Sequence, residues 1–344
     1  MEKNQNPRLQ NFLQPGEFSP LKAVWLAWPS DENLWEENFK GAQNSVLALA
    51  SAVQSGKAKV NLICANESRE REAKKKFLEK DIDATFFVIP YGDIWLRDTA
   101  PIFVKNSRNE LCSICFQFNG WGKKYILKGD QELSLAIAKI AGYPIYQSDF
   151  IFEGGSLEVN GQGLGITTKE CVLNPNRNPD IKKNDIENNL NFFLGVKNLI
   201  WLKNGLKNDH TDGHVDNLVR FITPEILLCM EPTNMEDPNY DVLMEIQETL
   251  REKTNLLGKK FKTLTLPSPG EVFDQKDNLM AASYLNFLII NQCVAVPQFQ
   301  RPNDQKVLDV FKKILPDKTI IGIDCLDLLT GGGGLHCISQ PVPS

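Results

Sequence analysis

Amphipathic segments alternate with short apolar segments along the chain. Apolar residues recurring every three or four positions predict helices over 41–56, 67–80, 130–142, 183–195, 239–255 and 303–315. Between them, runs rich in branched and aromatic residues predict strands over 23–28, 83–90, 198–202, 261–267, 284–297 and 318–323. This alternation predicts an α/β fold.

The alternation also bears on domain organisation. No low-complexity linker interrupts it, so residues 1–344 are predicted to form a single domain. Residues 1–14 are predicted to be a poorly ordered N-terminal extension. The first residues contain no apolar segment of signal-peptide length, and the apolar stretches are too interrupted to span a bilayer.

Residues capable of chemistry occur at intervals, in loops that follow apolar strand-like runs. With Asp98, Glu153, His214 and Cys337 as markers, the successive spacings are 55, 61 and 123 residues. The last spacing is close to twice the others, which indicates a repeat of about 60–70 residues whose fourth copy carries no polar marker. A period of this length is typical of propeller blades.

Composition and charge narrow the range of partners. A hydrophobic content of 42% and a charged content of 24% are those of a globular protein. The formal net charge of −5, without a lysine or arginine cluster, argues against nucleic acid as a partner and is compatible with a cationic ligand. Eight cysteines spread over so long a chain indicate reduced thiols in the cytoplasm.

The stretch LLTGGGGLHCIS places four consecutive glycines just before Cys337. Apolar residues flank the glycines, which predicts a tight, buried turn that presents the thiol. Backbone N–H groups at such a turn could lower the pKa of the thiol or stabilise an anion. The alternative is that Cys337 is only a small buried hydrophobic residue of the core. His336 is expected on the opposite face, as a supporting or core residue.

The densest polar cluster lies between Asp209 and Asp216. On a strand, His214 and Asp216 would point to one face, a sound way to hold a proton-transferring imidazole beside a carboxylate. The alternative is a metal-dependent hydrolase centred on this cluster. His210 and His214 would then need a helix to converge, which Gly213 opposes, so the catalytic pair is the preferred interpretation.

Three further residues are candidates. Asp98 follows Arg97. It could form a local salt bridge with Arg97, or it could be a functional residue of the active site. Trp95 could be a core residue or an aromatic wall for a cationic ligand. Glu153 is a lone carboxylate after an apolar strand and before two glycines, which indicates a functional residue.

A cysteine, a histidine and several carboxylates together suit a guanidinium substrate. This group is planar and positive, it pairs bidentately with carboxylates, and its carbon is electrophilic. Attack by Cys337 and loss of ammonia would leave a thiouronium, which water would hydrolyse to a ureido product. A guanidine-binding protein without catalysis is a further hypothesis, and it would require an inert thiol.

The chain resembles the agmatine deiminases of the guanidine-modifying superfamily. The resemblance spans nearly all of it and rests on the motifs YGDIWLRDTAPIFV, EGGSLEVNGQG, TTKECVLNPNRNP, DGHVDNLVRF, AASYLNF and GGGGLHCISQ. It implies a pentein fold, a five-bladed α/β-propeller with pseudo-five-fold ββαβ-type repeats. It also implies that one blade contributes little chemistry, in line with the missing marker.

The same resemblance implies residue roles. Cys337 would be the nucleophile and His214 the general acid and base. Asp98 and Asp216 would clamp the guanidinium, with Glu153 beside the histidine and the substrate. No metal ion and no organic cofactor is implied.

Trp95 matches a pocket tryptophan of the family, and two positions depart from the family pattern. The family usually has asparagine where Gly334 and Asp212 stand. Both positions border the site in the family, so both are expected to contact the substrate. The additional acidic group of Asp212 is expected to favour the second amine of agmatine.

The function expected from this resemblance is hydrolysis of agmatine to N-carbamoylputrescine and ammonia, in polyamine synthesis or agmatine breakdown. The nearest alternatives keep the chemistry with arginine or peptidyl-arginine as the substrate. A cytoplasmic enzyme is expected, with no nucleic-acid or membrane partner. Family members often form dimers, so a homodimer is expected.

Overall fold

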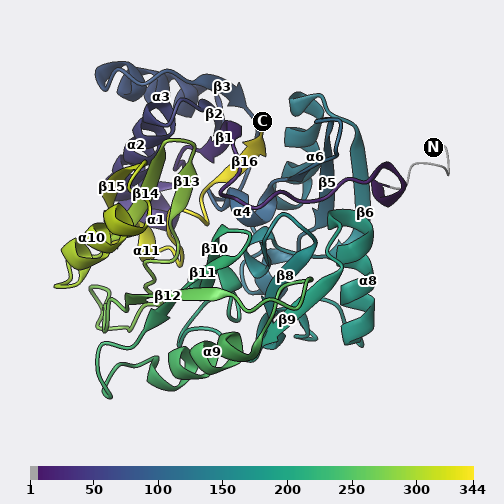
Figure 1. Ribbon diagram of the computed structural model, residues 1–344. Helices are drawn as coiled ribbons and strands as arrows, with labels where there is room; N and C mark the ends of the chain where they lie inside the picture. Colours follow the sequence, from purple (N-terminus) through teal and green to yellow (C-terminus); the bar gives the residue numbers. More distant parts are fainter. Residues whose placement is uncertain (1–6) are drawn as a thin grey trace.

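The computed structural model describes residues 7–344, whose strands form five separate sheets (Figure 1). Four sheets have three strands and share one construction. An antiparallel pair of strands comes first, a helix follows, and a third strand then runs parallel to the middle one. This ββαβ order therefore recurs along the chain, as the α/β alternation of the sequence predicted.

The elements of the four sheets have the following bounds. The first contains β4 (Ile102–Lys105), β5 (Leu111–Gln117), α6 (Asp130–Ala141) and β6 (Ile145–Ile151). The second contains β7 (Glu158–Val159), β8 (Leu164–Thr168), α8 (Lys183–Leu194) and β9 (Asn198–Leu202). The third contains β10 (Val219–Thr223), β11 (Ile226–Glu231), α9 (Tyr240–Glu252) and β12 (Lys262–Pro267). The fourth contains β13 (Leu288–Ile290), β14 (Cys293–Gln298), α10 (Asp304–Ile314) and β15 (Thr319–Asp324).

The fifth sheet joins the two ends of the chain. The last strand, β16 (Gln340–Pro343), pairs antiparallel with β1 (Leu21–Ala27). After α2 (Phe39–Ser55), β2 (Lys59–Cys64) runs parallel to β1, which repeats the same order. The helix α3 (Glu67–Glu79) and a fourth parallel strand, β3 (Thr85–Val88), extend this sheet.

The larger helices lie toward the outside of the molecule, as α3, α10, α9 and α8 show in Figure 1. Most of the buried apolar residues form one large core cluster, and a second cluster lies around β5, β6 and α8. Short elements occupy the loops before and between these strands and helices. They are η1 (Pro7–Gln10), α1 (Glu32–Trp35), η2 (Glu36–Asn38), α4 (Leu96–Thr99), α5 (Gly120–Lys123), η3 (Gly154–Ser156), α7 (Lys169–Val172), η4 (Val215–Asn217) and α11 (Leu326–Leu329).

The predicted helices agree with the structure to within a few residues, but one predicted strand does not. The run 284–297 forms two strands, β13 and β14, which pair as a hairpin. The turn between them contains Asn291 with a φ of 48°, a left-handed conformation that asparagine tolerates and that ends the first strand. Residues 284–287 precede β13 as a loop.

The predicted N-terminal extension over 1–14 falls partly on residues 1–6, which lie outside the described residues. Within 7–14, the chain forms η1 and then contacts the first three-stranded sheet. Phe12 is buried, and the backbone of Leu13 pairs with that of Lys105. Residues 7–14 are therefore packed against the domain instead of extending from it.

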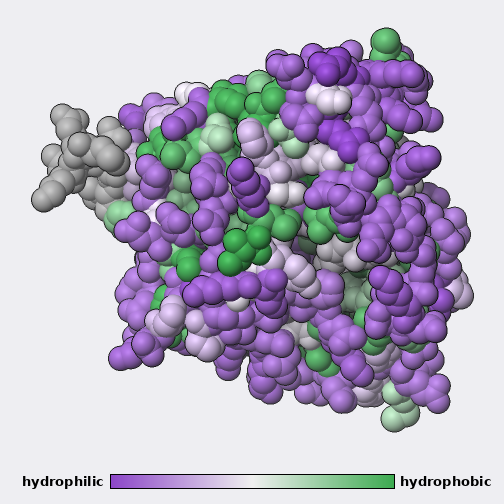
Figure 2. Space-filling model, turned by 180° about the vertical axis from the view of Figure 1, so that it is seen from behind, coloured by the Kyte–Doolittle hydropathy of each residue, from purple (hydrophilic) through white to green (hydrophobic). Residues whose placement is uncertain are grey.

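The described surface and cysteines are consistent with the composition. No helix within residues 7–344 is long and apolar enough to cross a membrane. Figure 2 shows one face covered mainly by hydrophilic residues, with hydrophobic residues in separate groups. All eight cysteines are buried and none forms a disulfide, in agreement with the predicted reduced thiols.

Candidate active site

The loops that precede the first strand of each repeat carry the candidate residues. Asp98 lies in α4 before β4, Glu153 before β7, His214 before β10, and Cys337 before β16. The fourth copy of the repeat, for which the sequence indicated no polar marker, is the one that begins with β13. Asn286 lies at the corresponding position before this strand. Asn286 contacts Cys337, so the expectation that this copy carries no polar marker is wrong.

A cavity of about 350 Å³ opens above Cys337. Asp98, Trp95 and Cys337 line it, whereas Glu153, His214 and Asp216 are buried and are not among the lining residues. Among the described residues that line it, five are acidic and only one is a lysine. These charged residues are Glu36, Glu37, Asp93, Asp98, Asp274 and Lys276.

Two of the four glycines, Gly331 and Gly333, lie against the tryptophan rings of this cavity, and Gly333 also lies against Cys337. A Cβ at Gly333 would lie 2.6 Å from the ring of Trp95 and 3.1 Å from Cys337 Sγ, too near for any other residue. Gly332 has a φ of 104°, a conformation that favours glycine. The predicted turn before Cys337 is present, but it is buried only from Gly333 onward, since Gly331 is exposed and Gly332 half-buried.

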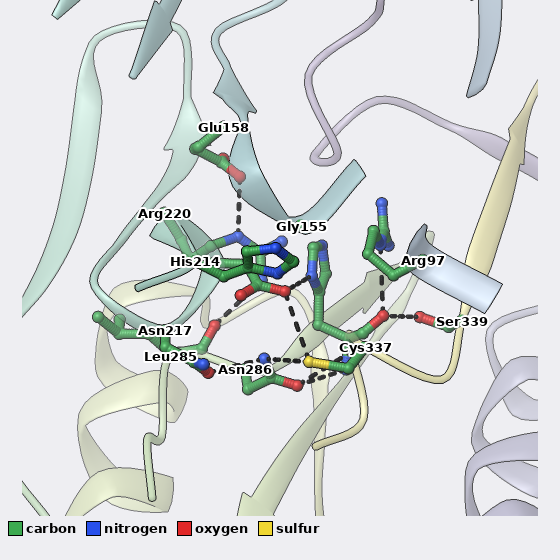
Figure 3. A network of polar contacts seen from close by, with 12 residues as sticks. Arg97, Gly155, Glu158, His214, Asn217, Arg220, Leu285, Asn286, Cys337 and Ser339 are labelled. Carbon is green, nitrogen blue, oxygen red and sulfur yellow. Dashed lines mark hydrogen bonds and ion pairs between the residues drawn. The ribbon is translucent and has the colours of Figure 1, made fainter. Parts of the chain in front are cut away.

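Asn286, which is not among the residues that line the cavity, contacts the thiol (Figure 3). Its Nδ2 lies 3.1 Å from Cys337 Sγ and donates to it, and its Oδ1 accepts from the backbone N–H groups of His336 and Cys337 at 2.9 and 3.3 Å. A Cβ at Gly334 would lie 2.6 Å from Asn286 Oδ1. Gly334 therefore makes room for Asn286, and it is not among the residues that line the cavity.

The thiol of Cys337 is held in its protonated form. Burial raises its pKa well above the ordinary value, and the carboxylates of Asp216 and Asp98 raise it further. The backbone of Gly334 and the amide of Asn286 act in the opposite direction but are outweighed. The glycine turn thus does not lower the thiol pKa below its usual range, contrary to one expectation from the sequence.

His214 is buried beside Glu153 and Asp98. Its Nε2 lies 2.9 Å from Glu153 Oε2, and its Nδ1 lies 3.8 Å from Asp98 Oδ2 without a hydrogen-bond partner. Burial alone would lower the pKa of this imidazole, but Asp98, Cys171 and Glu153 outweigh burial and raise it well above the ordinary value. The ring therefore carries its proton at neutral pH.

The prediction that His214 and Asp216 point to the same face of a strand is wrong. Gly213 has a φ of 88°, and His214 directly precedes the short helix η4 instead of lying on a strand. The imidazole of His214 contacts the carboxylate of Glu153, whereas the carboxylate of Asp216 contacts His336.

Arg177 anchors Glu153. Its Nε donates to Glu153 Oε1 at 2.8 Å and its Nη2 donates to Oε2 at 3.0 Å, a bidentate pair. Burial would raise the pKa of Glu153, but His214 and Arg177 outweigh it and lower that pKa. Arg177 escaped the residue-level analysis, although it lies in the motif CVLNPNRNP that carries the resemblance.

Asp98 is oriented by two donors. Trp121 Nε1 donates to its Oδ2 and the backbone N–H of Gly155 to its Oδ1, both at 2.9 Å. A Cβ at Gly155 would lie 2.5 Å from His214 Nδ1, so glycine lets Asp98 and the imidazole approach each other. Arg97 does not pair with Asp98, because its side chain contacts Glu17 and the backbone of His336.

Two tryptophans form one wall of the cavity. Trp35 and Trp95 stack with ring centroids 5.9 Å apart, and both indole N–H groups donate to the carboxylate of Asp93. Burial raises the pKa of Asp93 to about 7. Trp95 is therefore both buried and part of the cavity wall, where an aromatic face can attract a cation.

Asp216 and Asp212 have different surroundings. Asp216 Oδ2 lies 2.7 Å from His336 Nδ1 and 3.6 Å from Cys337 Sγ, and its Oδ1 has no hydrogen-bond partner. Asp212 instead pairs with Arg177 and with Lys124 Nζ at 2.8 Å. It is not among the residues that line the cavity.

The cluster from Asp209 to Asp216 does not converge on one point. His210 lines the cavity mouth, Asp209 accepts from Thr211, and His214 faces Glu153. Within residues 7–344, the group close enough to hold a metal ion is Glu153, Cys171 and His214. Because the guanidinium of Arg177 already pairs with Glu153, this geometry does not favour an additional cation.

The chain is similar to known proteins over nearly its whole length. The sequence profile described as Porphyromonas-type peptidyl-arginine deiminase matches residues 13–343. The agmatine deiminase of Pseudomonas aeruginosa is 31% identical over 98% of this chain and 97% of that protein, and the one of Pseudomonas putida is 32% identical over 99% and 98%.

Two solved structures are similar over their whole length. An agmatine deiminase of Enterococcus faecalis superposes with a TM-score of 0.93 at 29% identity, covering 100% of this chain and 99% of that one. A cysteine-to-serine variant of the agmatine deiminase of C. jejuni, with substrate bound, superposes with a TM-score of 0.85 at 30% identity, covering 97% and 96%.

Proposed function

The chain belongs to the Porphyromonas-type peptidyl-arginine deiminase family, and we propose that it hydrolyses agmatine to N-carbamoylputrescine and ammonia through a covalent intermediate on Cys337. One observation carries this proposal. The thiol lies 3.6 Å from a carboxylate of Asp216 that keeps one oxygen without a partner, in a cavity whose wall includes the carboxylate of Asp98. A planar cation can be held against the sulfur there.

The charge of the cavity supports agmatine over arginine. The acidic side chains along its wall and rim attract the ammonium group of agmatine and repel the α-carboxylate of arginine. Asp212 is bound to Arg177 and Lys124, so we assign the attraction of the second amine to the cavity carboxylates and not to Asp212.

The first half of the reaction forms the thiouronium. The guanidinium binds against Asp98 and Asp216, its positive charge offsets the two carboxylates, and the thiol loses its proton to water. Sulfur then attacks the guanidinium carbon and gives a tetrahedral adduct. Protonated His214 donates to the departing amino group, which leaves as ammonia.

The second half releases the product. Neutral His214 takes a proton from water, whose oxygen attacks the thiouronium carbon. The carbon–sulfur bond breaks, the hydroxyl proton of this second adduct passes through water to the leaving sulfur, and the ureido product departs with its carbonyl formed. Glu153 and Arg177 hold the imidazole ring in place through both halves.

The raised thiol pKa predicts slow alkylation of the free enzyme. Because the thiolate forms only above the pH at which an ordinary cysteine ionises, the iodoacetamide rate at Cys337 should be low at pH 7 and still rising at pH 9. Mass spectrometry of the peptide that contains Cys337 measures this rate. A plateau already reached near neutral pH would instead indicate a thiolate held by an ion pair.

The proposed function is tested by measuring ammonia and ureido product from agmatine, arginine and a peptidyl-arginine, each with and without EDTA. We expect turnover of agmatine, at least about a hundredfold slower turnover of arginine, and no effect of the chelator. Equal or faster turnover of arginine would assign another guanidine, and loss of activity with EDTA would indicate a metal-dependent hydrolase.

The resemblance supports a finer description of the fold. We propose that the five sheets are the five blades of an α/β-propeller, and that residues 1–344 form one catalytic domain. The pairing of β16 with β1, which joins the two ends of the chain, supports both. A cytoplasmic location and a homodimer stay predictions.

A further inference from the structure

A network of buried ionisable side chains lies next to Cys337, and none of its members is among the residues that line the cavity. Its members come from distant parts of the chain and are each at most 8% exposed, and they are Glu17, Arg97, Glu158, Asp216, Arg220 and His336. Figure 3 shows part of this network, with Arg220 and Glu158 in contact beside the residues that surround Cys337. Apart from Asp216, none of these side chains has a role in the proposed reaction.

Glu17 is the centre of the network. Its carboxylate pairs with Arg97, with Arg220 Nη2 at 2.7 Å, and with His336 Nε2 at 2.8 Å. Glu17 precedes β1, whereas its three partners belong to α4, β10 and the loop before β16. A single carboxylate near the N-terminus therefore connects three of the segments that build the site.

His336 links Glu17 to Asp216. Its Nδ1 lies 2.7 Å from Asp216 Oδ2, while its Nε2 faces Glu17. Ionised carboxylates only accept hydrogen bonds, so both ring nitrogens can donate only if the ring is doubly protonated. That form balances the network, with three carboxylates against two guanidiniums and one imidazolium, as burial of charge requires.

We propose that Glu17 is a positioning residue of the reaction, which acts through His336 to fix Asp216 and to offset its charge beside Cys337. This inference rests on the proposed function. With Oδ2 engaged by His336, Asp216 is left with Oδ1 for the substrate. The imidazolium also lies between the two carboxylates, one of which is in reach of the sulfur.

In Glu17→Gln the side chain that faces His336 Nε2 no longer carries a charge, so the contact that fixes the ring beside Asp216 is weakened. Asp216 Oδ2 is then less engaged by His336 and its charge acts more fully on the nearby sulfur, so the thiol of Cys337 becomes harder to ionise. The other charged groups that face these residues stay in place. They are Asp98 toward Cys337, His214 and Arg220 toward Asp216, and Arg97 and Arg220 toward position 17.

The test compares Glu17→Gln with Glu158→Gln. Both variants remove a buried carboxylate that pairs with Arg220, but only Glu17 contacts His336. For Glu17→Gln we expect kcat for agmatine to fall about tenfold with KM changed less than about threefold, and the pH profile of Cys337 alkylation to move up by about one unit. Glu158→Gln should keep the alkylation profile of the wild type.

A double variant separates positioning from mere support of the fold. If Glu17 acts through His336, then Glu17→Gln should have little further effect on the alkylation profile of His336→Gln. Equal shifts in Glu17→Gln and Glu158→Gln, or additive effects in the double variant, would overturn the proposal. The alkylation measurement needs no substrate, so its result is valid even if the wild type does not hydrolyse agmatine. That failure would refute the proposed function and not the link between Glu17 and Cys337.

Discussion

Cys337→Ser is expected to lower kcat for agmatine by at least about a thousandfold while the protein stays folded. A serine hydroxyl ionises at a much higher pH than a thiol in the same surroundings. The carboxylate within hydrogen-bond reach of the sulfur, Asp216, is a weak base because His336 lowers its pKa. The donors at Sγ are preserved, because Asn286 Nδ2 can donate to a hydroxyl as it does to the sulfur. The substitution therefore changes the nucleophile and little of its surroundings.

The measurement is ammonia release together with mass spectrometry of the protein during turnover. Wild type should show a covalent adduct on the peptide that contains Cys337, and the variant should show none. Cys229→Ala is the control, because Cys229 is a buried thiol on β11 without a role in the site. If Cys337→Ser kept more than about a tenth of the activity, the nucleophile would have to be sought elsewhere, first at Cys171 beside His214.

The local pattern predicted the fold class because each helix and strand has the periodicity of its own secondary structure. The repeat was visible for the same reason, since Asp98, Glu153, His214 and Cys337 each follow a strand and precede a sheet. What the spacing could not indicate is the chemistry of the missing copy. An asparagine is not conspicuous in a sequence, and only its approach to Cys337 reveals that Asn286 belongs to the site.

The residues that support the site were harder to predict. Arg177, Trp121 and Glu17 each lie 20 or more residues from the groups they hold in the fold, and pairs so distant leave no periodic signal. Neighbouring residues were also misread. The resemblance predicts that Asp212 contacts the substrate, because this position borders the site in the family, but the left-handed turn at Asp212 and Gly213 directs its side chain to Arg177.

His214→Gln is expected to lower kcat by roughly a hundredfold to ten-thousandfold, the range of a lost general acid and base. The amide of glutamine can keep a hydrogen bond to Glu153, but it can neither deliver a proton to the departing ammonia nor accept one from water. His214 does not line the cavity, so KM should change less than about threefold. A large rise in KM with kcat retained would assign His214 to substrate binding instead.

The pH dependence distinguishes this proton-transfer role from a structural one. Asp98, Cys171 and Glu153 hold the pKa of His214 well above its ordinary value despite burial, so the acid form persists through neutral pH and is lost only on the alkaline side. In the wild type, kcat should therefore fall at alkaline pH as His214 loses its proton, and this decline should be absent from the residual activity of His214→Gln.

The raised pKa also means that His214 stabilises the fold fully below the ordinary histidine pKa and loses that contribution as pH rises through the raised value. An alkaline decline of kcat that persisted unchanged in the variant would place the titrating group elsewhere and leave His214 without the role of general acid.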